Sequence, residues 1–319
     1  MRRRLLASGL AAGILAALAN GAPAQQVSQQ PVQFLIPWPA GGGTDIIGRT
    51  LQTAFAEALG GQVVIRNVGG AAGTMGSAEV ARARPDGTTL LLTSMSAIVI
   101  QPSFRPSVPY RVDSFAPVCL IADAPAVLMT TQNSGLRTVA DIVARAKVEP
   151  GRFPYASGGV GGLGHIAMTA LSRAAGIELN HIPYRGSGDS ILAIQQGTVA
   201  LLTAEANLVK QYGLHAIGVF AERRMAEYPD APTMREQGYD LSFPLWTGLY
   251  APAGTPEAAL ARLEAACERT LRTPAIVESM TRLAHPIRFL GRAEFGAFTR
   301  AEATKYHAVV EAAGMRQAD

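Results

Sequence analysis

Cysteine is nearly absent from this sequence, which has two in 319 residues. Cys119 lies in a short apolar run, and Cys267 lies in a helical pattern. Neither has a second cysteine at CxxC spacing or a histidine at ligand spacing, so the sequence argues against a metal site and against redox chemistry. An exported chain could join the two cysteines, but nothing in the sequence brings their positions together. We therefore favour two buried free thiols and leave the disulfide open.

Net charge is also small. Charged residues make up 16% of the chain, and the formal net charge is +4. Three of the positive charges are Arg2, Arg3 and Arg4, so the rest of the chain carries about +1. A nearly neutral chain lacks the positive field that nucleic-acid binding needs, and we expect no nucleic-acid partner.

Long apolar runs are confined to the N-terminus. The three arginines precede an apolar stretch from Leu5 to Leu18, and Ala22-Pro23-Ala24 matches a cleavage site. The alternative is a membrane anchor, but the stretch is too short to span a bilayer comfortably. We expect residues 1–24 to be a signal peptide, cut before Gln25.

Common catalytic motifs are missing or incomplete. The sequence has no Gly-x-Ser-x-Gly elbow and no P-loop lysine. Gly159, Gly161 and Gly164 match the dinucleotide fingerprint GxGxxG, but the strand that follows ends in Tyr184-Arg185, where the fingerprint needs an acidic residue. We therefore expect no enzyme and no cofactor. An exported enzyme that uses this loop is the alternative.

Glycine, in contrast, is abundant, and it marks the segment from Phe34 to Gly60. A short apolar strand there runs into Gly41-Gly42-Gly43 and then into a helix. Glycines let the backbone pass close to a bound group, and the first N–H groups of a helix face it with the positive end of the dipole. The pattern therefore predicts a cradle for an anion, although a tight turn that binds nothing has the same pattern.

The strand, glycine turn and helix recur along the chain. Thr88 to Thr93 is a third apolar strand, and a loop of the same kind follows the strand Phe153 to Ala156. Ligands bind at the carboxyl ends of strands in such sheets. We predict an α/β fold with two lobes, each a mostly parallel sheet flanked by helices. The expected boundaries are 25–123 plus 246–319 for lobe I and 124–245 for lobe II.

Taken together, the motifs resemble one family, the Bug-type receptors, which are the solute-binding proteins of tripartite tricarboxylate transporters. The resemblance covers nearly the whole chain after the signal peptide. The motifs that carry it occur in the family's order: Pro37-Trp38-Pro39-Ala40-Gly41-Gly42-Gly43-Thr44-Asp45, Arg84-Pro85-Asp86-Gly87, Tyr155-Ala156-Ser157-Gly158, Pro183-Tyr184-Arg185-Gly186, Ala231-Pro232-Thr233 and Gly248-Leu249-Tyr250-Ala251-Pro252. Ala200 departs from the pattern, because the family commonly has an acidic residue there, so the ligand's identity stays open.

The resemblance implies a periplasmic binding protein of type II that closes on a small carboxylate and meets the membrane subunits of a secondary transporter. It implies a monomer without a metal site. A sensory binding protein without a transporter is the alternative. The residues that the resemblance assigns to ligand binding are Trp38, Gly42, Gly43, Thr44, Asp45, Thr74, Met75, Ser94, Ser96, Ser157, Gly158, Gly161, His165, Tyr184 and Arg185.

Two acidic residues need separate treatment. Asp45 stands where it could cap a helix, which is the role we favour, or it could order the loop or accept a hydrogen bond from the ligand. The sequence does not say whether Glu205 reaches the cleft.

Overall fold

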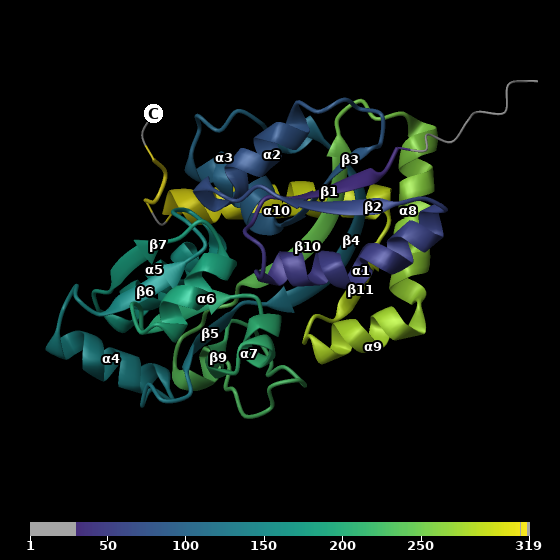
Figure 1. The fold of residues 1–319 in the computed structure, drawn as a ribbon. Helices are drawn as coiled ribbons and strands as arrows, with labels where there is room; N and C mark the ends of the chain where they lie inside the picture. Colours follow the sequence, from purple (N-terminus) through teal and green to yellow (C-terminus); the bar gives the residue numbers. More distant parts are fainter. Residues whose placement is uncertain (1–29, 313, 318–319) are drawn as a thin grey trace, which may run out of the picture.

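The computed structural model describes residues 30–312 and 314–317, so the expected signal peptide lies outside the described residues. Two sheets, each covered by helices, form two lobes that lie side by side (Figure 1). We call the six-stranded sheet with its helices the first lobe and the five-stranded sheet with its helices the second lobe. Within the described part of the chain, no helix has the length and apolar character needed to cross a membrane.

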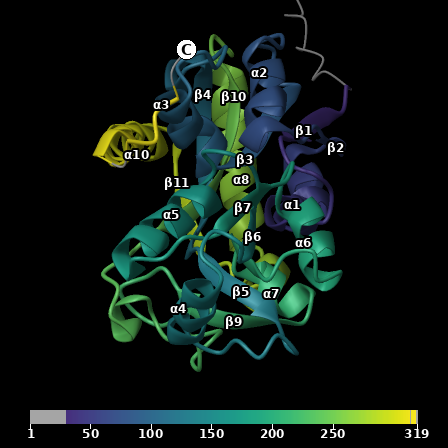
Figure 2. The same ribbon diagram turned by 90° about the vertical axis from the view of Figure 1, so that its left-hand side faces the viewer.

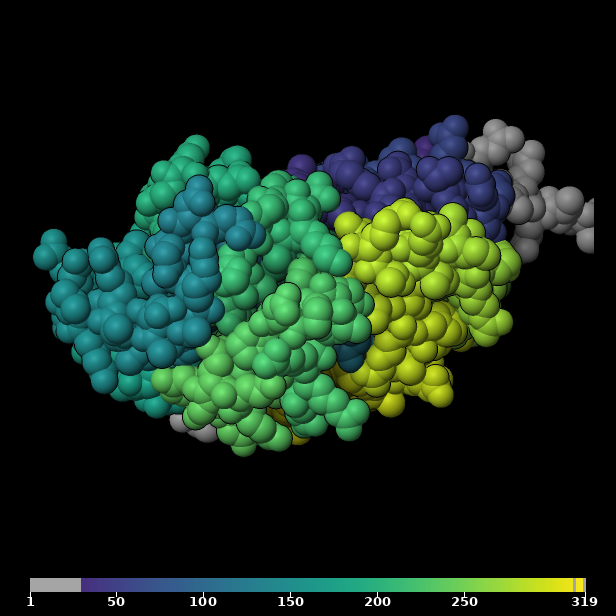
Figure 3. All heavy atoms as spheres, turned by 90° about the horizontal axis from the view of Figure 1, so that it is seen from below, coloured from purple at the N-terminus to yellow at the C-terminus, as the bar shows by residue number. Residues whose placement is uncertain are grey.

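The first lobe is built from both ends of the described chain. In Figure 3 the purple atoms of the N-terminal segment lie against the yellow atoms of the C-terminal segment. Its strand order is β11-β4-β10-β3-β1-β2. Its strands are β1 (Val32–Ile36), β2 (Val63–Asn67), β3 (Thr89–Ser94), β4 (Phe115–Pro125), β10 (Pro244–Pro252) and β11 (Ile287–Leu290). Its helices are α1 (Gly43–Leu59), α2 (Thr74–Ala81), α3 (Gln101–Phe104), α8 (Glu257–Arg272), α9 (Pro274–Arg282) and α10 (Arg292–Ala312).

The second lobe comes from the middle of the chain. Its strand order is β7-β6-β8-β5-β9. Its strands are β5 (Val127–Thr131), β6 (Pro154–Ser157), β7 (Asn180–Pro183), β8 (Leu201–Ala204) and β9 (Leu214–Val219). Its helices are α4 (Val139–Val148), α5 (Leu163–Ala175), α6 (Ser187–Gln195) and α7 (Asn207–Gln211).

The sheets are mixed, which differs from the mostly parallel sheets that we expected. In the first lobe, β1 pairs in parallel with β2 and β3, whereas β10 is antiparallel to β3 and β4. In the second lobe, β6 is parallel to β7 and β8, and β5 is antiparallel to β8 and β9. The reason is the route between lobes: the chain leaves through β4 and returns through β10, and these two paired strands run in opposite directions (Figure 2).

Buried strands explain why the glycine loops stand where they do. The side chains of β1 and β3 are almost all buried. The polar and glycine residues that follow each strand therefore lie outside the core, at the edge of the sheet. β1 ends just before the glycine turn, and α1 then packs back on the sheet through Ile47, Leu51 and Phe55. Gly60, in a left-handed conformation, ends this helix. The hydrophobic pattern thus fixes the loop at the carboxyl edge of the sheet.

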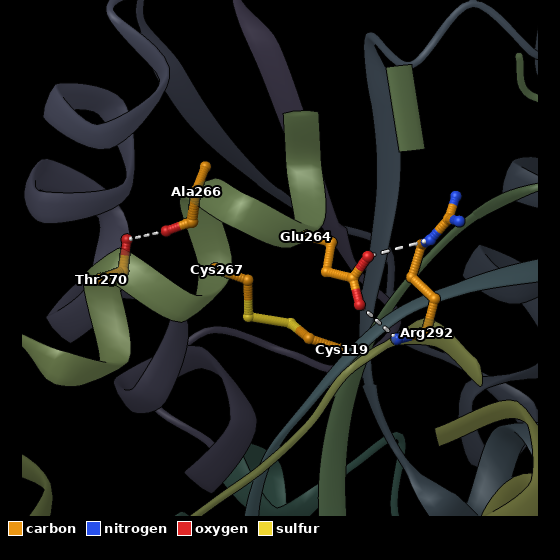
Figure 4. The surroundings of a disulfide bond; sticks show 6 residues. All are labelled: Cys119, Glu264, Ala266, Cys267, Thr270 and Arg292. Atoms are coloured by element: carbon orange, nitrogen blue, oxygen red, sulfur yellow. Dashed lines mark hydrogen bonds and ion pairs between the residues drawn. A yellow bond between two sulfur atoms is a disulfide. The ribbon is translucent and has the colours of Figure 1, made fainter. Parts of the chain in front are cut away.

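The two cysteines form a disulfide, so the expectation of two free thiols was wrong. Cys119 on β4 is bonded to Cys267 on α8, with a separation of 148 residues along the chain (Figure 4). Nearby, the carboxylate of Glu264 accepts hydrogen bonds from the backbone and side chain of Arg292. The helix that carries Cys267 lies on the sheet because of apolar contacts spread over many residues, which local sequence does not reveal. The disulfide ties the C-terminal helices to the first lobe.

Candidate functional site

A cavity of ≈ 40 Å³ lies where the two lobes meet, with room for about three water molecules. The first lobe lines it with Trp38, Ser94, Ser96 and Leu245, and the second lobe lines it with Gly158, Gly162, Leu163, Gly164, Ser187, Thr203, Ala204 and Glu205. Larger hollows of ≈ 870 Å³ and ≈ 620 Å³ each lie on one lobe only. A hollow of ≈ 550 Å³ lies between α5 of the second lobe and α10 of the first. Among these four, the small cavity is the one lined by residues at the carboxyl ends of strands from both sheets.

Three helices begin at this junction. α1, α5 and α6 have glycine N-caps, Gly42, Gly162 and Gly186, which carry no side chain that could cap the helix. In α5 the N–H of the first residue, Leu163, is taken by Ser96 Oγ. The starts of α1 and α6 are close together, because a Cβ on Gly42 would lie 3.0 Å from Ser187 Oγ and 3.3 Å from the nitrogen of Gly188. Uncapped helix starts offer free N–H groups and positive dipole ends. The junction is therefore suited to an anion.

Unpartnered polar atoms surround the same cavity. Trp38 Nε1 and Thr203 Oγ1, both on lining residues, have no hydrogen-bond partner among the described residues. Thr44, in the first turn of α1, is 1% exposed, and its Oγ1 is also without a partner there. Buried polar groups in folded proteins are nearly always hydrogen-bonded. Thr44 does not line the cavity, so Trp38 Nε1 and Thr203 Oγ1 are the atoms that mark it as a place for a polar ligand.

Hydrogen bonds between the lobes hold the cavity shut. Tyr212 Oη donates to the carbonyl oxygen of Gly41 at 2.6 Å, and Asn207 Nδ2 donates to that of Gly43 at 3.2 Å. On the other side, the N–H of Leu163 donates to Ser96 Oγ at 3.1 Å. These contacts describe a closed arrangement, so a ligand larger than a few atoms enters only if the lobes separate.

Asp45 orders the glycine loop and does not cap α1, which corrects the role that we favoured. The helix begins at Gly43 with Gly42 as its N-cap. The Asp45 carboxylate accepts hydrogen bonds from the N–H of Gly41, from Arg49 Nε and from Asn67 Nδ2, each at 2.9 Å. Burial by itself raises the pKa of Asp45, but these donors outweigh it and hold the pKa below its usual value. The Asp45 carboxylate therefore stays ionised, and these three donors hold it in place.

Ser157 does not line the cavity, and its hydroxyl is hydrogen-bonded to a histidine. Its Oγ is 2.7 Å from His181 Nε2 and accepts a hydrogen bond from the N–H of Gly159. His165 stacks on His181 with ring centroids 4.1 Å apart, and its Nδ1 accepts from the N–H of Gly161. Burial, and then the charge of His165, lower the pKa of His181 to about 4. The pair is neutral at neutral pH and shapes the glycine loop.

Gly161 faces the other lobe and not the cavity. A Cβ on Gly161 would lie 2.3 Å from the ring of Phe104 on α3, and its φ of +73° favours glycine. The absence of a side chain at this position lets the second lobe approach the first. Gly161 therefore permits closure, which is a different role from the ligand contact that we expected.

The remaining expected residues divide into two groups. Trp38, Ser94, Ser96 and Gly158 line the cavity, and Gly43 lies against Glu205 beside it. Thr74, Met75, Tyr184 and Arg185 do not line it. Met75 is 58% exposed, and Arg185 Nη2 donates to the carbonyl oxygen of Gly69 at 3.4 Å.

Sequence reasoning missed several lining residues. Ser187 directly follows the motif Pro183-Tyr184-Arg185-Gly186, and Gly162 and Gly164 stand within the span of the glycine fingerprint. Thr203 and Glu205 lie at the end of β8, where the rule that ligands bind at the carboxyl ends of strands could have found them.

Comparison with known proteins identifies the family. The family model described as the tripartite tricarboxylate transporter family receptor matches residues 47–315. The chain belongs to this family. Among similar proteins, Protein BugT of Bordetella pertussis is 32% identical over 271 residues, which is 83% of this chain and 83% of BugT.

Two solved structures of receptors have the same fold. The periplasmic binding protein BugD is 27% identical with a TM-score of 0.86, over 90% of this chain and 99% of BugD. MatC from Rhodopseudomonas palustris, solved with bound malate, is 26% identical with a TM-score of 0.82, over 88% of this chain and 98% of MatC. The Bug-type resemblance and the two-lobed α/β fold of a periplasmic binding protein are therefore confirmed.

Proposed function

We propose that this receptor binds a small carboxylate in the periplasm, in the cavity between its lobes, and presents it to the membrane subunits of a tripartite tricarboxylate-type transporter. The observation that carries the proposal is a cavity lined by the first residues of α5 and α6 and by Trp38, whose Nε1 has no partner among the described residues. Malate in the related MatC supports the same ligand class.

The chemistry of the cavity wall favours a carboxylate held by neutral donors. No lysine, arginine or histidine is among the described residues that line it. Backbone N–H groups at helix starts and the Trp38 indole can together donate several hydrogen bonds to two oxygen atoms. Because the site excludes water once closed, each of these bonds is stronger than it would be at the surface. We propose that the protein acts as a monomer and carries out no chemistry on the ligand.

Both lobes must contribute donors if binding is to drive closure. Trp38 and α1 belong to the first lobe, whereas α5 and α6 belong to the second. A carboxylate that bridges them holds the lobes closed around itself, further apart than in the arrangement described above, and so shifts the population away from the open state. The closed shape is what a membrane partner could distinguish from the open one.

The test is a thermal shift panel on the mature protein, with monocarboxylates, dicarboxylates, tricarboxylates and free amino acids. Each acid is paired with its amide, for example malate with malamide, because the amide keeps the shape and removes the charge. A ligand at a hundred times its Kd adds about 2.7 kcal/mol, which raises Tm by several degrees. We expect at least one acid to do so and its amide to fail. Equal shifts for acid and amide, or no shift across the panel, would contradict the proposal.

A further inference from the structure

Glu205 is a buried carboxyl group at the wall of the cavity. It directly follows β8, is 7% exposed and lines the cavity together with Ser187 and Thr203. Its side chain lies over the first residue of α1, because a Cβ on Gly43 would come within 2.6 Å of Glu205 Cγ and 2.7 Å of its Cδ. Gly43 thus makes room for this side chain, which crosses from the second lobe to the first.

Glu205 differs from the other buried carboxylates among the described residues. Asp45 is paired with Arg49 and Asn67, and Glu302 accepts hydrogen bonds from Trp246 Nε1 and Lys305 Nζ. Glu205 takes part in no ion pair found in the described part of the chain. Burial raises its pKa, and its own N–H and the Ser187 hydroxyl only partly offset this effect. A buried carboxylate without a cationic partner is costly, so Glu205 favours its protonated form in the closed cavity, and a ligand that supplies a cation beside it would let it ionise.

We propose that Glu205 selects a ligand that carries a cationic nitrogen beside its carboxylate, such as a free amino acid. This inference rests on the proposed function, since it assumes that the cavity holds a carboxylate. The ligand's carboxylate faces the helix starts, and its ammonium group donates to Glu205. A dicarboxylate supplies no cation there, so it binds only beside a Glu205 that keeps its proton, because two ionised carboxylates in a cavity without a basic side chain repel each other.

The wild-type test compares ligands that differ only by an ammonium group. Titration calorimetry at pH 7.5 measures succinate against L-aspartate and glutarate against L-glutamate, with propionate against L-alanine as a shorter pair. We expect the amino-bearing member of at least one pair to bind 10-fold more tightly or better. The decisive pair is the one that contains the tightest-binding ligand. The inference is overturned if the acid without the ammonium group in that pair binds as tightly as the corresponding amino acid or more tightly.

A substitution assigns the preference to Glu205. Glu205→Gln keeps the shape and removes the charge, and we expect it to weaken the amino acid at least 10-fold while it strengthens the dicarboxylate, so that the order reverses. Glu302→Gln is the matched control, because Glu302 is buried in the first lobe away from the cavity. This variant should prefer the amino acid over the dicarboxylate by the same factor as the wild type. An unchanged preference in a folded Glu205→Gln protein, with folding checked by Tm, also overturns the inference.

The outcomes separate the two proposals. If no carboxylate of either kind binds the wild-type protein, the proposed function fails and the inference fails with it. If dicarboxylates bind and amino acids do not, the proposed function stands and the inference alone fails. The comparison of paired ligands on the wild-type protein tests the inference even if Glu205→Gln does not fold.

Discussion

The two lobes build their halves of the cavity by different means. The first lobe contributes the uncharged side chains Trp38, Ser94 and Ser96, and the Asp45 carboxylate holds the glycine loop that follows Trp38. The second lobe contributes two helix starts and Glu205, and the disulfide lies outside it. The first lobe thus supplies a neutral wall, and the second lobe supplies the carboxyl group that we propose selects the ligand.

The largest expected effect comes from blocking the approach of the two lobes. Gly161→Val places a branched side chain against the Phe104 ring, and we expect affinity for the acid with the largest thermal shift to fall more than 100-fold while the lobes stay folded. Gly176→Val is the matched control. Gly176 also has a positive φ, +61°, but nothing lies within 4 Å of its added Cβ, so this variant carries the backbone strain without the clash. Calorimetry that finds equal affinity in the two variants would rule out the closure role of Gly161.

Removing the disulfide tests whether the first lobe depends on it. The double variant Cys119→Ala, Cys267→Ala opens a loop of 148 residues, and such a loss costs about 2–5 kcal/mol of stability. We expect Tm to fall by several degrees and the Kd at 25 °C to change less than 2-fold. Treatment of the wild type with a reductant should lower Tm in the same way. An unchanged Tm in the double variant would show that the bond contributes nothing to the first lobe.

Trp38→Phe removes one donor from the neutral wall and keeps most of the ring. A hydrogen bond contributes about 0.5–1.5 kcal/mol, so we expect affinity to fall about 2- to 10-fold. Trp246→Phe is the control, because the Trp246 indole donates to Glu302 at 3.2 Å inside the first lobe. It should lower Tm and leave Kd unchanged. Equal affinities for wild type and Trp38→Phe would remove the Trp38 indole N–H from the site.

The smallest effect concerns the histidines behind the second lobe's wall. The pKa of His181 is lowered to about 4, so as pH falls below 6.5 the unfolded chain takes up a proton before the folded chain does, and stability decreases. Because His181 is partly exposed, we expect a loss of about 1 kcal/mol between pH 7 and pH 4.5. His285 has its pKa lowered in the same way, so His181→Asn should only flatten the dependence of Tm on pH. A His181→Asn profile parallel to the wild type would contradict this assignment.

The sequence predicted those parts of the fold that depend on local patterns. Buried strands, glycine turns and amphipathic helices follow from residues near one another, so the loop before α1 and the two lobes could be predicted. The disulfide could not, because it depends on how α8 packs on β4 from a distance of 148 residues.

The candidate site shows the same limit. Trp38 and Gly158 could be named because they stand in recognisable loops. The direction in which Ser157, Gly161 and Met75 face could not be predicted, because a shift of one residue along a turn moves a residue from the cavity to the core or to solvent. The rule on strand ends could have pointed to Glu205, but its burial against Gly43 depends on how the two lobes pack together.

The most direct measurement uses the two tryptophans of the chain, Trp38 and Trp246. An ¹H–¹⁵N spectrum shows one indole signal for each, and Trp38→Phe assigns them. On titration with the acid that gives the largest thermal shift, we expect the Trp38 indole signal to move downfield as its N–H gains a hydrogen bond, while the signal of Trp246, already bonded to Glu302, stays in place. A Trp38 signal that does not move while calorimetry reports saturated binding would place the ligand elsewhere and contradict the account.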